Sequence, residues 1–146
     1  MPSRPETFEF SDRDTVGLVA EMDRLAASGK GWINLAPDLD EDEKPEGSVA
    51  LCTWVVGQMR RDRREPDSIG VQHATGGKAA ARLVPAEVTL PEGWRVMQDH
   101  RRRGLVVAIA PEATHGEVLS WLLRAGTALT DPAFGGRWRA DVYQGR

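Results

Sequence analysis

The densest group of chemical side chains lies in the stretch MQDHRRRGLV. It contains Asp99, His100, Arg101, Arg102 and Arg103, followed by Gly104. A histidine beside a carboxylate is suited to general acid–base chemistry, and arginines bind carboxylates and phosphates. Neighbouring residues of a strand point to opposite faces, however, so Asp99 and His100 cannot form a dyad with each other in an extended chain. We therefore expect a solvated hairpin turn here, closed at Gly104, with the arginines and His100 as candidate binding residues.

A metal site is not indicated by the spacing of the possible ligands. The histidines and cysteines are His73, His100, His115 and Cys52. They form none of the spacings C-x-x-C, H-x-x-x-H or H-E-x-x-H that zinc sites use. The run Asp38, Asp40, Asp42 begins like a calcium loop but lacks the later glycine and glutamate of that motif. We expect no metal and no cofactor.

An anion site is a weaker candidate at Gly76, Gly77 and Lys78, just before a short expected helix. Backbone N–H groups at a helix start attract anions. A P-loop also needs glycine where Gln72 stands and serine or threonine where Ala79 stands, so a nucleoside triphosphatase is not supported. The alternative is a plain turn before the helix.

Nucleic-acid binding depends on a second arginine cluster. Its members are Arg60, Arg61, Arg63 and Arg64. Together with residues 101–103 they make a basic patch if both turns lie at the same end of the sheet. The net charge of −3 and the acidic residues among the second cluster weigh against this function.

Nucleophilic catalysis has little support. Cys52 lies in the apolar run SVALCTWVVG and is expected to be a buried thiol. The motif G-x-S-x-G is absent, and Ser120 falls inside an amphipathic helix. His115 is expected at the surface near a helix cap. The tryptophans are all expected in the core: Trp32, Trp54, Trp94, Trp121 and Trp138.

The pattern of the chain predicts one α+β domain over residues 1–146, with an acidic loop at 37–47. We expect a mixed, mostly antiparallel sheet of about five or six strands, two longer helices and one short helix. The expected helices lie in SDRDTVGLVAEMDRLAASGKG (cap Ser11, end Gly29), GGKAAARLV and THGEVLSWLLRAGTAL (cap Thr114). The expected strands lie in WINLA, VALCTWVV, SIGVQHA, WRVMQDH, LVVAIA and GGRWRADVY. Periodicity alone leaves residues 49–56 open between a buried strand and a buried helix.

The bulk composition is that of an ordinary globular chain. The 146 residues are 40% hydrophobic and 28% charged, and a single cysteine allows no internal disulfide. The sequence has neither the apolar core of a leader peptide nor a run long enough to span a membrane, so we expect a cytoplasmic protein without membrane contact.

The last third of the chain resembles a known group of proteins. The stretches PEGWRVMQDHRRRGLVV, EVLSWLLRAGTAL and GRWRADVY are similar to the C-terminal part of small uncharacterised proteins of high-GC Gram-positive bacteria. The resemblance implies no activity, cofactor or site residue.

Charge is distributed unevenly and suggests a binding role. Residues 1–47 hold five basic and twelve acidic side chains, a net charge of −7, and the rest of the chain carries +4. Without a catalytic constellation, we favour a non-enzymatic protein-binding or regulatory module that uses its arginine turns or acidic loop, with a protein partner or a second copy as ligand. The alternative is a small enzyme or ligand-binding protein with a site around His73 and His100. A weak nucleic-acid binder ranks third.

Overall fold

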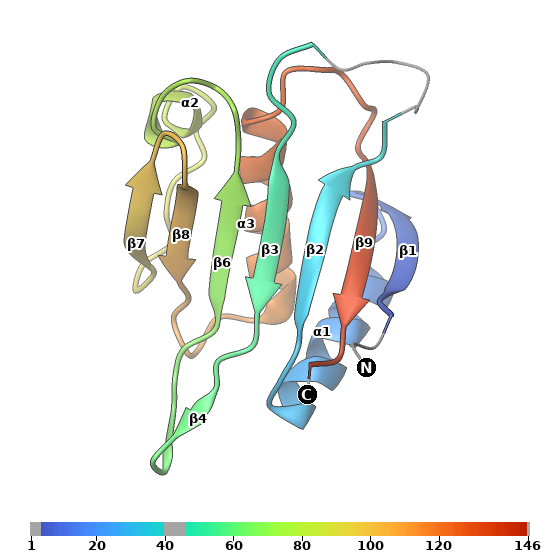
Figure 1. Ribbon diagram of the computed structural model, residues 1–146, viewed down its shortest axis with the longest axis vertical. Helices are drawn as coiled ribbons and strands as arrows, with labels where there is room; N and C mark the ends of the chain where they lie inside the picture. Colours follow the sequence, from blue (N-terminus) through green and yellow to red (C-terminus); the bar gives the residue numbers. More distant parts are fainter. Residues whose placement is uncertain (1–3, 40–45, 146) are drawn as a thin grey trace.

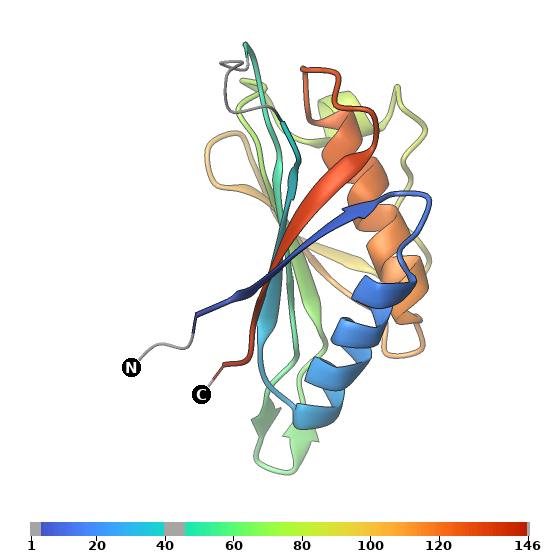
Figure 2. The ribbon, with the colours of Figure 1, turned by 90° about the vertical axis from the view of Figure 1, so that its right-hand side faces the viewer.

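The computed structural model describes residues 4–39 and 46–145 and builds them into a seven-stranded sheet with helices against one face (Figure 1, Figure 2). The sheet consists of β1 (Glu6–Ser11), β2 (Trp32–Pro37), β3 (Leu51–Val55), β6 (Ser68–Gln72), β7 (Arg95–His100), β8 (Gly104–Ala108) and β9 (Arg137–Tyr143). A separate ribbon is formed by β4 (Met59–Arg60) and β5 (Arg63–Arg64). The helices are α1 (Val16–Ser28), α2 (Ala80–Leu83) and α3 (His115–Ala128).

The predicted fold class is wrong, because the sheet differs from the prediction in strand number and in strand direction. The strand order is β1-β9-β2-β3-β6-β8-β7, and every neighbouring pair is antiparallel, so the sheet is neither mixed nor limited to five or six strands. Sheet dominates, since only two of the described helices exceed seven residues. Strand β1 was not predicted because its pairing partner, β9, lies at the other end of the chain, and a six-residue edge strand has a weak pattern of its own.

Because of β1, the first helix begins later in the chain than predicted. Ser11 is the last residue of β1 rather than a helix cap, and α1 begins at Val16 after Thr15. The expected end of α1 is confirmed, because Gly29 adopts the left-handed conformation with φ of 76°. The cap of α3 is confirmed too, since the Thr114 side chain accepts a hydrogen bond from the backbone N–H of Glu117.

Side chains alternate across the sheet as a one-sided core requires. Buried residues recur at every second position of β2, β3, β6 and β9 and point toward the helices, as in Ile33, Trp54, Val71 and Trp138. Residues 51–55 are therefore a strand, which settles the choice left open for this apolar run. None of the described helices is long and apolar enough to cross a membrane.

Helix α3 crosses the middle of the sheet and packs tightly against it at Gly126. A Cβ added there would lie 2.7 Å from the Cys52 Sγ and 2.8 Å from the Trp138 ring. Trp121 fixes the other side of the helix through a 2.8 Å hydrogen bond from its Nε1 to the Thr89 carbonyl oxygen. The sheet–helix distance is thus set by a position that has no side chain.

We predict that Gly126→Ala destabilises the protein although alanine favours helix. Overpacking costs about 1–3 kcal/mol, which exceeds the gain of about 1 kcal/mol in helix propensity. Gly116→Ala in the same helix is the matched control, because the nearest atom to its added Cβ, the Thr114 Oγ1, is 3.9 Å away. Urea unfolding measures both. Equal stability changes in the two variants would contradict the close packing at Gly126.

Candidate functional site

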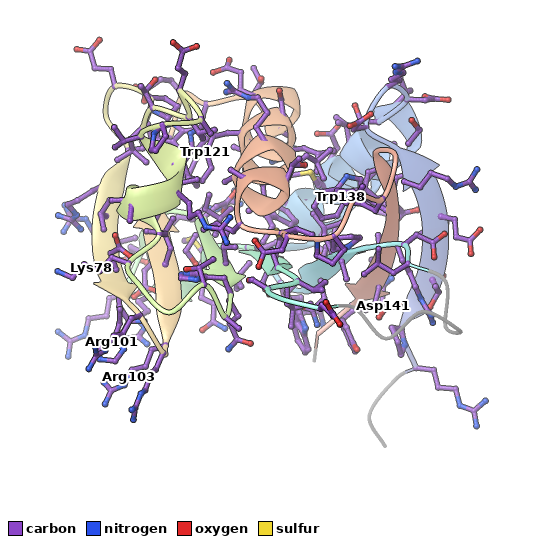
Figure 3. All side chains as sticks on the ribbon, turned by 90° about the horizontal axis from the view of Figure 1, so that it is seen from above. Lys78, Arg101, Arg103, Trp121, Trp138 and Asp141 are labelled. Carbon is purple, nitrogen blue, oxygen red and sulfur yellow. The ribbon has the colours of Figure 1, made fainter. Side chains whose placement is uncertain are left out.

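The arginine turn is the tip of the β7–β8 hairpin, as the sequence indicates. Arg101, Arg102 and Arg103 are exposed, and the labelled Arg101 and Arg103 extend away from the body of the protein (Figure 3). The Nδ1 atom of His100 accepts hydrogen bonds from the backbone N–H groups of Arg102 (3.1 Å) and Arg103 (3.2 Å). His100 therefore closes the turn with one ring nitrogen, and the arginine side chains remain at the surface.

The two arginine clusters do not form one basic patch. Arg60 and Arg61 lie in the β4–β5 ribbon, which joins the end of β3 to the start of β6, whereas the 101–103 turn lies at the opposite end of the sheet (Figure 1). Arg60 is also paired with Glu65 at 3.0 Å. The strand directions explain this separation. Strand β6 begins at the β4–β5 ribbon, and β7 runs parallel to β6, so β7 ends at the opposite end of the sheet from the ribbon.

The proposed site around His73 and His100 is not assembled. His73 continues the buried row of Ile69 and Val71, on the helix side of the sheet. His100 pairs with Gly104 and points to the other side. The Nδ1 of His73 hydrogen-bonds with the Thr75 hydroxyl at 2.9 Å, while its buried Nε2 has no protein partner.

The candidate anion site at Gly76, Gly77 and Lys78 is followed directly by two backbone N–H groups that already bind a carboxylate of the protein itself. Asp99 accepts hydrogen bonds from the backbone N–H groups of Ala79 (2.8 Å) and Ala80 (3.3 Å) at the start of α2. An external anion at the first residues of α2 would use these same two donors. Helix α2 also has only four residues, so its dipole is small. The plain turn is the better interpretation of these glycines.

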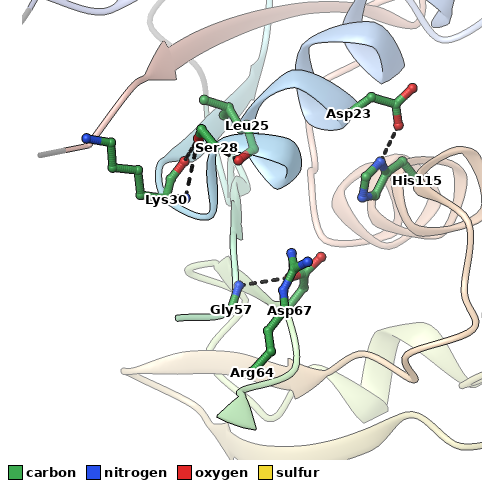
Figure 4. Close-up of polar contacts among 8 residues, drawn as sticks. All are labelled: Asp23, Leu25, Ser28, Lys30, Gly57, Arg64, Asp67 and His115. Atoms are coloured by element: carbon green, nitrogen blue, oxygen red, sulfur yellow. Dashed lines mark hydrogen bonds and ion pairs between the residues drawn. The ribbon is translucent and has the colours of Figure 1, made fainter. Parts of the chain in front are cut away.

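His115 and Asp23 form a pair that the sequence pattern does not indicate. The Nδ1 of His115 and the Oδ1 of Asp23 are 2.5 Å apart (Figure 4), and the imidazole also packs edge-on against Trp54 at 5.4 Å. His115 borders an open pocket of about 640 Å³ that Arg64 and Arg95 also line. No sequence signal could reveal this pair, because its members are 92 residues apart. The described residues that line the pocket include no hydroxyl or thiol nucleophile.

The remaining candidate groups show no arrangement for chemistry. Cys52 is fully buried, and burial raises the pKa of its thiol to about 12, as expected for a core cysteine. Within residues 4–39 and 46–145, no three histidine, cysteine or carboxylate side chains are grouped closely enough to hold a metal ion. Most of the acidic loop 37–47, at residues 40–45, lies outside the described residues.

One side of the sheet carries no described helix, as Figure 2 shows edge-on. We call it the open face and define it by three rows of side chains that the strand register brings side by side. Row one holds Tyr143, Trp32, Val55, Ser68, Ala108 and Arg95, and row two holds Thr7, Asp141, Asn34, Thr53, Gly70, Val106 and Gln98. Row three combines three paired groups, Glu9–Arg139–Ala36, Leu51–Gln72 and Gly104–His100, which lie one residue beyond the paired parts of β2 with β3 and of β6 with β8.

The middle of the open face is uncharged and partly aromatic. The twelve positions that β2, β3, β6 and β8 contribute carry no ionisable side chain. Leu51, Val55 and Trp32 are 39%, 37% and 37% exposed, and the Trp32 ring stacks on Tyr143 with centroids 4.8 Å apart. The prediction that all tryptophans lie in the core is therefore wrong for Trp32. Its position in the alternating pattern of β2 is the signal that could have identified it.

Comparison with known proteins adds no functional information. No known protein family matches the chain, and neither a curated protein nor a solved structure is significantly similar to it.

We predict that His73 lowers stability below about pH 6.5. Burial lowers the pKa of His73 from 6.5, an effect that the charge of Asp99 opposes and that of Arg82 adds to. His73 therefore binds a proton more strongly in the unfolded chain than in the folded protein. As the pH falls from 6.5 through the lower pKa of the folded protein, the free energy of unfolding decreases. His73→Gln should remove this part of the pH dependence in urea unfolding. Parallel pH profiles for the two proteins would contradict the prediction.

Proposed function

We propose that this protein is a non-enzymatic protein-binding module whose contact surface is the open face of its sheet. The observation that carries the proposal is the uncharged centre of that face, in a chain of which 28% is charged. An exposed surface with apolar and aromatic side chains is typical of protein interfaces, whose centres are depleted in charge.

The edges of the open face supply the polar rim that such an interface needs. Arg139 and Asp141 lie on the β9 side, and Arg95 and His100 lie on the β7 side beside the arginine turn. In this interpretation the arginines at 101–103 keep the binding role that the sequence suggested, but as rim residues that affect association rate and specificity more than affinity.

A nucleic-acid ligand fits this surface less well. Binding to a phosphate backbone requires cationic side chains along the path of the strand. The four central strands offer none, and the basic residues 60–64 belong to the opposite end of the sheet from the arginine turn. The Trp32–Tyr143 stack uses one face of each ring within the protein, which leaves less aromatic surface for a base.

We predict that a photo-crosslinking residue at Leu51 captures a protein in living cells. Benzoylphenylalanine at Leu51 should give an adduct of discrete mass that nuclease does not alter, because Leu51 lies in the uncharged centre of the open face. The control is the same substitution at Val84, which is 72% exposed but lies just after α2 on the helix side. Equal adducts from both positions, no adduct from Leu51, or an adduct removed by nuclease would each overturn the proposal.

A further inference from the structure

Row one of the open face has bulky side chains on one side of β3 and small side chains on the other. In row one, Trp32 on β2 and Ser68 on β6 lie on either side of Val55 of the central strand β3. One strand further out, Tyr143 on β9 corresponds to Ala108 on β8. The bulky aromatic pair is therefore on one side of β3, and small residues occupy the equivalent positions on the other.

The other two rows also place side chains of unequal size on the two sides of β3. In row two, Asn34 on β2 and Gly70 on β6 lie on either side of Thr53. In row three the larger residue is on the opposite side, with Ala36 on β2 and Gln72 on β6. Each row thus combines a larger and a smaller side chain at equal distances from β3.

This arrangement is self-complementary under a two-fold axis. The axis runs parallel to β3 and lies directly above it, between the two copies. Rotation about this axis places β2 of one copy opposite β6 of the other. Each larger residue then meets its smaller counterpart, Trp32 over Ser68 and Asn34 over Gly70, while Val55 faces the same residue of the second copy. Facing sheets of a sandwich cross at about 30°, so the match holds best for the strands nearest the axis, which are β2, β3 and β6.

The same axis brings charged groups of the rim into contact only at the outer strands. Glu9 on β1 and His100 on β7 occupy the two ends of row three, so the rotation carries Glu9 of one copy over His100 of the other. Arg139 and Asp141 of β9 come over the uncharged Gly104 and Val106 of β8. The charged residues of the open face are confined to β1, β9 and β7. No like charges therefore meet near the centre.

The area is of the size that a stable dimer needs. Seven strands spaced about 4.8 Å apart and about 17 Å long give a face of roughly 600 Å² in projection. The accessible area of a surface covered with side chains exceeds its projection, which brings it near the roughly 800 Å² per partner of a standard interface.

We propose that the open face binds a second copy of this chain, face to face, with β3 of both copies at the two-fold axis. The inference rests on the proposed function, because it names the partner for the same surface. In an isologous interface each residue on the axis meets itself. The test therefore uses Val55, which is 37% exposed and whose substitution leaves the core intact.

Val55→Arg and Val55→Glu should each abolish the dimer, and an equimolar mixture of the two should restore it. Identical charges would meet at the axis in either variant alone, whereas arginine would meet glutamate in the mixture. Sedimentation equilibrium should give twice 16.0 kDa for the wild type and for the mixture, and 16.0 kDa for each variant alone. Native mass spectrometry should find the mixed dimer. Val84→Arg is the matched control on the other side and should remain dimeric, and urea unfolding confirms that every variant folds.

The outcomes separate this inference from the proposed function. A monomeric wild type, together with a protein adduct of foreign mass from Leu51, overturns the second copy as partner and keeps the open face as a binding surface. Dimers that both Val55 variants retain overturn the inference, because the copies then meet elsewhere. Loss of the dimer without rescue in the mixture overturns the axis at β3.

Discussion

The contact between α3 and the middle of the sheet is the interaction on which the rest of the structure depends. At Gly126 the helix approaches Cys52 and Trp138 so closely that a methyl group has no room. This contact joins the C-terminal helix to β3 and β9, two strands from distant parts of the chain. Because helix and sheet bury their apolar sides against each other here, the remaining helices have one side of the sheet to cover, and α1 packs beside α3 on that side (Figure 2).

A sheet with helices on one side has a second side that must meet water or a partner. In many antiparallel sheets that second side is polar, which gives alternation between apolar and charged residues. Here the four central strands alternate between buried residues and exposed but uncharged ones, such as Leu51 and Val55. The absence of charge in the centre, and its presence on the outer strands, gives the surface the composition of an interface.

The polar groups that first suggested chemistry serve mainly to hold turns and helix ends in place. Asp99 ties the start of α2 to β7, and His100 closes the β7–β8 turn. Both carboxylate oxygens of Asp99 and one ring nitrogen of His100 are used in these contacts. The arginines of the two turns are separated by the length of the sheet, so neither cluster strengthens the other.

The sequence by itself determined most of the elements, because each depends on neighbours along the chain. The periodicity around Trp121, the cap at Thr114, the glycine at position 29 and the alternation in residues 137–143 are local signals, and the structure confirms the elements that they predict. Only the tertiary structure decided what depends on residues far apart. Strand β1 exists because β9 pairs with it, His115 has Asp23 as a partner from another helix, and Trp32 is exposed because no described helix lies over its side of the sheet. The rows of the open face follow from strand register, which hydrogen bonds between distant segments set and which no local pattern encodes.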